Sequence, residues 1–222
     1  MKIIRTHDGV NTLYNKDLGE HYHSIHGANN ESQHVFIDMG LDALPNSKEE
    51  INVFEMGFGT GLNALLSLDW AMQNERKVCY NTIELYPITM DLVKLLNFSE
   101  IENLSYLKDK FKEMHECNWE EKYALSPFFT ILKNKMNLEN VFVKQDMDII
   151  FFDAFSPDKQ PELWTIEIFE KMKQLLKLNG CLVTYCAKGY VRRNMIAAGL
   201  TVERLQGPPG KREMLRASVL KK

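Results

Sequence analysis

The segment FEMGFGTGLNALL, residues 54–66, holds the first residues whose types and spacing suggest chemistry. Its glycines, Gly57, Gly59 and Gly61, separate a short apolar run from a run with apolar residues at helical spacing. Glycine tolerates a positive φ and has no Cβ to keep a ligand away from the backbone. The spacing G-x-G-x-G differs from the dinucleotide fingerprint G-x-G-x-x-G. The turn therefore predicts close approach of a small molecule other than a dinucleotide.

Two acidic residues are candidates to bind a ligand at this glycine turn. Glu55 stands two residues before the first glycine, and Glu84 ends the next apolar run. A carboxylate beside the turn suits a ligand with an amino group or positive charge better than a pyrophosphate. A strand-end acid can accept hydrogen bonds from ribose hydroxyls. Together they predict an adenosine-containing ligand without a diphosphate, which S-adenosylmethionine fits; the alternative is a tight packing turn that binds nothing.

A third acid follows the most apolar run of the chain. In IIFFDAFSPDKQPELW, residues 149–164, Asp153 ends a fully apolar stretch and a proline-punctuated loop follows. Because parallel strands end at one edge of a sheet, Asp153 is expected to face the same crevice as the glycine turn. There it would act as a general base or orient an amine, with a hydrogen-bonding partner to offset its burial. The alternative role is a helix cap or loop contact.

The C-terminal part of the chain is basic although the whole is not. Net charge is −3, but residues 188–222 hold nine Lys or Arg and two Asp or Glu. The segments KGYVRRN and GPPGKREM present most of these cations, the second on a loop stiffened by two prolines. This pattern suits contact with phosphates. Ordinary exposed charge is the alternative explanation.

Other patterns exclude several classes of protein. No apolar run reaches membrane-spanning length, and MKIIRTHDGV has no signal-peptide core, so we expect a cytoplasmic protein with no membrane contact. Cys79, Cys117, Cys181 and Cys186 form no CxxC pair and are expected to be free thiols. The HYHSIH segment matches no zinc signature, and we expect no metal.

Elements of alternating type must position these residues. Strands are expected at 51–56, 77–85, 126–136, 147–155, 181–187, 200–205 and 212–220, and helices at 62–73, 87–98, 161–180 and 190–199. Apolar strands alternating with helices predict an α/β fold, a mostly parallel sheet with helices on both faces. Asp8-Gly9 predicts a hairpin near the start.

These segments, with YHSIHGANNESQHVFI at residues 22–37, resemble the tRNA 5-aminomethyl-2-thiouridine methyltransferases over nearly the whole chain. DAFSPDKQPELW and GPPGKREM are the most specific matches. The resemblance implies a class I Rossmann-like methyltransferase domain at residues 46–222 and a small β-rich N-terminal extension at 1–45, in one compact unit. It implies methylation of the amine of 5-aminomethyl-(2-thio)uridine at the tRNA wobble position, with the base leaving its stack to reach the site.

The resemblance also implies roles for individual residues. Asp153 would be catalytic, beside the target amine. S-adenosylmethionine would contact Glu55, Gly57, Phe58, Gly59, Gly61, Asn63, Glu84, Asn137 and Asp153. Asn137 stands where many relatives carry an acid, which leaves its contact with adenine open. Substrate contacts would come from Tyr22, His23, Glu31, Ser32, Phe155, Pro157, Lys188, Arg192, Arg193, Lys211 and Arg212.

Expected partners follow from the same resemblance. We expect tRNA as substrate and no stable protein partner, with a separate oxidase acting upstream as a candidate. The chain ends at Lys222, before the FAD-binding half of bifunctional relatives, so no FAD is expected. Two alternatives stay open: an S-adenosylmethionine-dependent N-methyltransferase or aminopropyltransferase-like enzyme for small amines, and a non-catalytic RNA-binding module.

Overall fold

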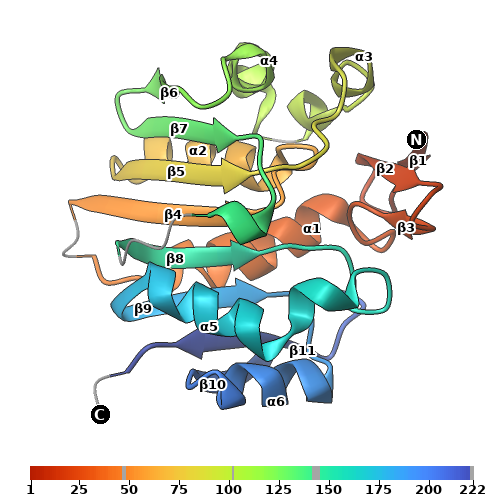
Figure 1. The fold of residues 1–222 in the computed structure, drawn as a ribbon. Coiled ribbons are helices and arrows are strands. Elements are labelled where there is room, and N and C mark those ends of the chain that lie inside the picture. The colour runs from red at the N-terminus through yellow and green to blue at the C-terminus, as the bar shows by residue number, and fades with distance from the viewer. Residues whose placement is uncertain (47–48, 102, 142–145, 221–222) are drawn as a thin grey trace.

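The computed structural model describes residues 1–46, 49–101, 103–141 and 146–220, in which eight strands form one central sheet (Figure 1). The strand order is β10-β11-β9-β8-β4-β5-β7-β6. The parallel strands are β4 Glu50–Met56, β5 Lys77–Ile83, β7 Phe129–Asn134, β8 Met147–Phe152 and β9 Leu176–Thr184. The antiparallel pairings add β6 Lys122–Ser126, β10 Thr201–Gln206 and β11 Glu213–Ser218. The predicted mostly parallel α/β sheet is confirmed.

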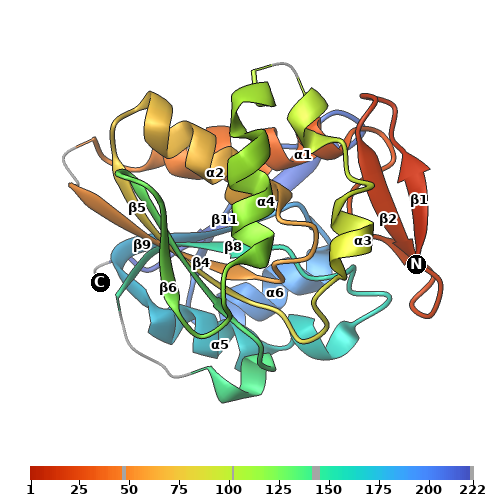
Figure 2. The same cartoon turned by 90° about the horizontal axis from the view of Figure 1, so that it is seen from above.

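Helices cover both faces of this sheet (Figure 2). The bounds of the α-helices are α1 Ala28–Ser32, α2 Leu62–Gln73, α3 Met90–Val93, α4 Lys108–Glu116, α5 Ile166–Leu175 and α6 Gly189–Ala197. Alternation along β4 explains the two layers, since successive strand residues point to opposite faces. Val53 packs into the core cluster that contains Leu65 of α2, and Phe54 packs into the cluster that contains Phe169 of α5. Each face of the sheet therefore has its own apolar core.

Chain order across the sheet fixes where a ligand can enter. The chain runs from β4 to β5 and β7 on one side, then returns to β8 and β9 on the other side of β4. The loops after β4 and β8 therefore leave the sheet in opposite directions and leave a crevice between them. In sheets of this type, ligands bind at that switch point, beyond the carboxyl ends of the strands.

A second, three-stranded sheet stands at this carboxyl edge. It consists of β1 Lys2–Arg5, β2 Asn11–Asn15 and β3 Glu20–His21, and it lies on the side toward which the arrowheads of β5 and β8 point (Figure 1). The hairpin predicted at Asp8-Gly9 is confirmed, with Arg5 opposite Asn11 and a positive φ of 81° at Gly9. The strand structure of this segment ends at His21, and residues 28–43 form short helices.

Short helical turns complete the connections. A π-helix spans Gln33–Asp38, and 3-10 turns span Leu41–Ala43, Phe98–Glu100, Ser105–Leu107, Leu138–Asn140 and Pro161–Trp164. The helix expected at 87–98 is shorter than predicted, because α3 covers only its middle.

The helix expected at 161–180 was predicted wrongly at both ends. A 3-10 turn precedes α5, which ends at Leu175, and Gly180 lies within β9. A Cβ at Gly180 would approach the carbonyl oxygens of Lys177 and Met147 to 2.9 and 3.1 Å. Glycine is thus required for close packing of β8 against β9, where the pairing register shifts, and not to end the helix.

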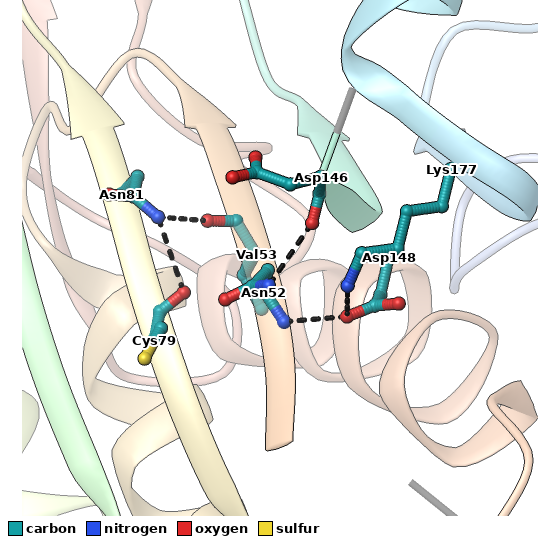
Figure 3. Close-up of polar contacts among 7 residues, drawn as sticks. All are labelled: Asn52, Val53, Cys79, Asn81, Asp146, Asp148 and Lys177. Carbon is teal, nitrogen blue, oxygen red and sulfur yellow. Dashed lines mark hydrogen bonds and ion pairs between the residues drawn. The ribbon is translucent and has the colours of Figure 1, made fainter. Parts of the chain in front are cut away.

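Polar contacts align the strands near their amino-terminal ends, opposite the crevice (Figure 3). The buried carboxylate of Asp148 accepts hydrogen bonds from the backbone N–H of Asn52, at 2.8 Å, and from Lys177 Nζ, at 3.1 Å. The side-chain amide of Asn52 donates to the carbonyl of Asp146 at 3.1 Å. These bonds join β4, β8 and β9, and they fix the position of β8 relative to β4 along the strand direction.

Candidate functional site

A cleft of about 1040 Å³ opens at the carboxyl ends of the parallel strands. Its walls come from the glycine turn, the ends of β5 and β8, and the N-terminal segment. Many of the residues expected at the site line it: Tyr22, His23, Glu31, Gly57, Phe58, Gly59, Asn63, Glu84, Asn137, Asp153, Phe155 and Lys211. The structure therefore brings together residues separated by as much as 189 positions in the chain, from Tyr22 to Lys211.

The other expected residues lie outside this lining. They are Ser32, Glu55, Gly61, Pro157, Lys188, Arg192, Arg193 and Arg212. Glu55 and Ser32 are each 1% exposed, which places their side chains in the interior. Arg193 and Arg212 are exposed on the surface. Lys188 forms an ion pair with Asp158.

The glycine turn is held close to both neighbouring strands. Gly57, Gly59 and Gly61 have φ values of 92°, 52° and 78°, which residues with a Cβ rarely adopt. The N–H groups of Gly57 and Phe58 donate to the carbonyl of Ile83 at 3.2 and 3.1 Å. A Cβ on Gly57 would meet only the Asp153 carbonyl, at 3.5 Å. The turn thus presents bare backbone to the cleft.

Glu84 is fixed at the end of β5 by backbone donors. Its carboxylate accepts hydrogen bonds from the N–H of Gly59 at 3.0 Å and of Tyr86 at 2.9 Å. A carboxylate has about four acceptor positions, so two backbone bonds leave capacity for hydroxyl donors from a ligand. Burial, and then the negative charge of Glu84, raise the pKa of Tyr22 to about 12. Tyr22 is therefore a neutral phenol at the mouth of the same site.

Two neutral histidines hold Thr60 in the middle of the glycine turn. His115 Nε2 lies 3.1 Å from the Thr60 carbonyl, and because a carbonyl only accepts, His115 is the donor. His23 Nε2 lies 3.2 Å from Thr60 Oγ1, and His23 Nδ1 lies 2.9 Å from Thr12 Oγ1. Burial lowers the pKa of both imidazoles to about 4. Both rings therefore stay neutral at ordinary pH, and each comes from a different element.

Lys133 supports the His115 contact from β7. Its buried ammonium donates to the carbonyls of Met114, at 2.7 Å, and His115, at 3.0 Å. It also lies 4.9 Å from the ring centroid of Trp119. A cation at a helix C-terminus satisfies carbonyls that have no intrahelical partner. Lys133 thus fixes the end of α4, from which His115 reaches the glycine turn.

Asp153 follows the last residue of β8 and faces the cleft. The side-chain amide of Asn63, in the first turn of α2, donates to its Oδ2 at 2.8 Å, which confirms the expected partner. Burial raises the pKa of Asp153 to about 7, against the opposing effect of the Asn63 hydrogen bond. Glu31 raises this pKa further and Lys211 lowers it. A carboxyl group poised near neutral pH can both accept and release a proton.

Glu55 lies beneath the cleft floor, between β4 and α2. Neither carboxyl oxygen has a hydrogen-bond partner of good geometry, and the surrounding polar groups belong to Thr82, Asn63 and Tyr80. Burial raises the pKa of Glu55 well above its ordinary value. Glu55 is therefore a buried acid behind Asn63, in surroundings that favour its neutral form.

The outer wall of the cleft combines aromatic rings and charges. Tyr22 and Phe155 pack edge to face with ring centroids 5.0 Å apart. Lys211 forms an ion pair with Glu31, and its Nζ lies 4.1 Å from the ring centroid of Tyr185. The Tyr185 hydroxyl donates to the Ala154 carbonyl at 2.9 Å. This wall joins the N-terminal segment to the loops after β8, β9 and β10.

Sequence analysis missed three residues of this site. Tyr185 directly follows β9, so the strand-end rule that identified Glu84 and Asp153 would also have found it. Glu20 lines the cleft and accepts a hydrogen bond from the Ser156 hydroxyl. His115 lies on a helix far from the glycine turn in sequence, and no motif marks it.

The described residues form neither a three-residue metal centre nor a helix that could span a membrane. No group of three or more His, Cys, Asp or Glu side chains among them is arranged to hold a metal ion. Of the helices in these parts of the chain, none is long and apolar enough to cross a membrane. Cys79, Cys117 and Cys186 are free thiols.

Two curated proteins are similar to this chain over most of its length. The tRNA 5-methylaminomethyl-2-thiouridine biosynthesis bifunctional protein MnmC of Cupriavidus metallidurans is 29% identical over 95% of this chain and 33% of that protein. The MnmC protein of Vibrio campbellii is 30% identical over 85% of this chain and 31% of that protein. The chain thus spans about a third of the length of the curated relatives it matches.

Two solved structures share the fold of this chain, and a family model matches its C-terminal part. The crystal structure of MnmC2 from Aquifex aeolicus matches with a TM-score of 0.79 and 24% identity, over 98% of this chain and 69% of that chain. A spermidine synthase from Thermotoga maritima matches with a TM-score of 0.52 and 14% identity, over 94% of this chain and 68% of that chain. The family model for S-adenosyl-L-methionine-dependent methyltransferases matches residues 103–220, more than half of the chain. This protein therefore belongs to the family of S-adenosyl-L-methionine-dependent methyltransferases that this model describes.

Proposed function

We propose that this protein methylates the primary amine of 5-aminomethyluridine, with or without a 2-thio group, at the tRNA wobble position. The product is the 5-methylaminomethyl nucleoside. The observation that carries most weight is the position of Asp153: its backbone carbonyl lies beside Gly57, and its carboxyl group, with a pKa of about 7, belongs to the same cleft as the glycine turn. Similarity over 95% of the chain to a protein named for biosynthesis of that nucleoside supports the choice of substrate.

The cleft fits the methyl donor of the family. Bare backbone at Gly57 leaves room for close contact, and Glu84 retains acceptor capacity for ribose hydroxyls. Asn137 lines the same cleft and offers both a donor and an acceptor toward an adenine. S-Adenosylmethionine supplies an electrophilic methyl group on a sulfonium sulfur when bound. No residue of this site needs to form a covalent bond to the methyl group.

Asp153 is the proposed acceptor of the proton that the substrate amine must lose before it reacts. A protonated amine has no lone pair, so it must lose a proton before its nitrogen attacks the methyl carbon. Asp153 accepts that proton at a carboxylate oxygen, while Asn63 holds the carboxylate in place. As the new N–C bond forms, the S–C bond breaks and its electron pair stays on sulfur. Alignment of nitrogen and methyl group supplies much of the rate enhancement.

The N-terminal segment closes the site and restricts water. The Tyr22 ring would lie 3.2 Å from a Cβ placed on Gly59, so it covers the turn directly. Its edge-to-face contact with Phe155 joins this segment to the loop after β8. A flipped uridine base would stack against these rings, as enzymes that modify nucleobases commonly arrange. The phenol and imidazole of Tyr22 and His23 are both neutral there.

Basic residues of the C-terminal part would contact the tRNA backbone. Arg193 and Arg212 are exposed, and Lys211, which precedes Arg212 in the chain, lines the cleft. Lys188 is the N-cap residue of α6, and Arg192 lies within that helix. Such contacts orient a nucleic acid without reading its sequence. A separate enzyme would supply the aminomethyl group, and no flavin step is assigned to the described residues.

Transfer of labelled methyl from S-adenosylmethionine to tRNA that carries 5-aminomethyluridine tests the proposal. Matched tRNA without the aminomethyl group is the negative control. Label in the first tRNA alone is the expected result, and equal or absent label in both contradicts the proposal.

A small-molecule amine is the second candidate substrate. Glu20 and Glu31 line the cleft together with Asp153, and several carboxyl groups would attract any small ammonium ion. Free primary amines offered to the same assay separate the two substrates, because only a small-amine enzyme labels them at rates above those for tRNA.

A further inference from the structure

The cleft already contains one bound primary ammonium group, that of Lys211. Its Nζ forms an ion pair with the Glu31 carboxylate and lies 4.1 Å from the centroid of the Tyr185 ring. A carboxylate and an aromatic face are the two groups that proteins combine to bind alkylammonium ions. The two groups therefore form a niche that selects an ammonium group, whichever molecule carries it.

Glu31 and Tyr185 each have a further hydrogen bond that anchors them, whereas Lys211 is a partly exposed side chain on a loop. The other Glu31 oxygen accepts a hydrogen bond from the Ser24 N–H at 3.3 Å, and the Glu31 side chain is 13% exposed. Tyr185 is anchored by its hydroxyl on the Ala154 carbonyl at 2.9 Å. The Lys211 side chain is 32% exposed and comes from a loop at the rim. Lys211 can turn outward while the niche keeps its shape.

The niche is electrostatically joined to the candidate base. Glu31 and Lys211 are the two charged groups that act on the titration of Asp153, in opposite directions. If the Lys211 ammonium left, the repulsion between Glu31 and Asp153 would no longer be offset by this cation, which favours binding of a new cation. The aminomethyl group of the proposed substrate is a primary ammonium ion at neutral pH and has the same chemistry as Lys211 Nζ.

We propose that Glu31 and the face of Tyr185 bind the substrate's primary ammonium group, and that Lys211 occupies this niche in the free protein. The inference rests on the proposed function and assigns the recognition of its substrate. Arrival of tRNA draws Lys211 outward to phosphate, and the substrate ammonium takes its place. From there the nitrogen gives one proton to Asp153, and its lone pair then forms the bond to the methyl carbon. Glu31 is a specificity residue in this scheme, and Lys211 is a displaceable occupant.

A double-mutant cycle separates this role of Glu31 from a role in merely holding Lys211. Glu31→Gln, Lys211→Met and the double variant are compared with wild type in single-turnover methylation of 5-aminomethyluridine tRNA at saturating S-adenosylmethionine. We expect Glu31→Gln to lower kcat/KM by at least about tenfold in both backgrounds, because Glu31 acts on the substrate even when Lys211 is gone. A double variant that matches Lys211→Met overturns the inference, since Glu31 then acts only through Lys211.

Matched controls keep these results interpretable. Glu113→Gln removes another Lys–Glu ion pair, at 2.9 Å to Lys110 on α4, outside the cleft lining, and should keep wild-type rates. Tyr185→Leu, which removes the ring face, should lose more activity than Tyr185→Phe, which retains it. Equal losses in these two variants count against the aromatic part of the niche. Calorimetry of S-adenosylmethionine binding checks that each variant is folded. If the wild-type protein labels no tRNA, the proposed function itself is wrong. If the wild-type protein is active and the double variant matches Lys211→Met, only the inference about Glu31 is wrong.

Discussion

The side-chain amide of Asn63 donates a 2.8 Å hydrogen bond to Asp153, and so joins the first turn of α2 to the end of β8. The bond spans the switch point of the sheet, between the two loops that diverge from β4 and β8. It connects the helix that begins at the glycine turn to the candidate base. The proposed sites of donor binding and of proton acceptance are thereby held in one arrangement.

Loss of the candidate base should abolish methyl transfer and spare donor binding. Asp153→Ala is expected to lower the single-turnover rate by about 100- to 10,000-fold, the range for removal of a general base. The affinity for S-adenosylmethionine, measured by calorimetry, should stay within a few-fold of wild type. Near-normal turnover in this variant would remove Asp153 from the proposed role.

The activity should depend on pH through Asp153. Because the base must be deprotonated, the rate should rise with pH up to about 7, the pKa of Asp153, and level off above it. Asn63→Ala removes a hydrogen bond to the charged form of Asp153, which raises the pKa of this carboxyl group. The break in the pH–rate profile of this variant should therefore move to higher pH. Single-turnover rates between pH 5.5 and 9 measure both profiles. An unchanged break in Asn63→Ala would show that another group controls the pH dependence.

The same carboxyl group should cost stability at neutral and higher pH. Its pKa in the folded protein is about 7, above the ordinary 3.8, so the folded state binds the proton more tightly than the unfolded state. Stability is therefore fully present below the ordinary pKa and is lost as pH rises toward 7. Asp153→Asn should raise the Tm relative to wild type by a few degrees at pH 8, roughly what 1 kcal/mol gives at this chain length, and by less at pH 5. Equal shifts at both pH values would contradict burial as the cause.

His115 should affect donor affinity more than the chemical step. His115→Ala removes the 3.1 Å bond to the Thr60 carbonyl and frees the glycine turn, and we expect S-adenosylmethionine to bind roughly tenfold more weakly. His115→Gln keeps an N–H donor and should recover part of that affinity. The rate at saturating donor should change little. A fall in this rate with unchanged affinity would assign His115 a different role.

The exposed basic loop should set the salt dependence of tRNA binding. Lys211→Ala combined with Arg212→Ala should weaken binding and reduce the slope of log affinity against log salt by about one for each lost phosphate contact. Lys77→Ala, at the start of β5 and thus on the opposite edge of the sheet, is the control and should keep the slope. Filter binding from 50 to 300 mM salt, about a sixfold range, measures it. An unchanged slope in the double variant would place these two residues away from the RNA.

The sequence was most informative where chain position alone decides geometry. The bounds of α2 match the predicted range, because glycines precede a regular apolar helix pattern. Glu84 and Asp153 meet at the cleft because each follows a parallel strand, and such strands end at one edge. These features depend on local pattern and on a topological rule, both of which a single sequence carries.

Features that depend on packing between distant segments were not predictable. β6 was missed because its residues are mostly exposed, and only its pairing with β7 makes them a strand. The contact between His23 and Thr60 joins two segments 37 residues apart and has no sequence signature. Glu55 was expected to face the ligand, yet it shares the face of β4 with Val53, beneath α2. Alternation along β4 explains its burial once the position of α2 is known.

The most direct test of the account identifies the nucleoside that receives the methyl group. Purified protein is incubated with labelled S-adenosylmethionine and tRNA that bears 5-aminomethyl-2-thiouridine, and the RNA is digested to nucleosides and analysed by mass spectrometry. The account predicts label in 5-methylaminomethyl-2-thiouridine, and none there with Asp153→Ala. Label in a different nucleoside, or no label in tRNA from protein that binds the donor normally, would contradict it.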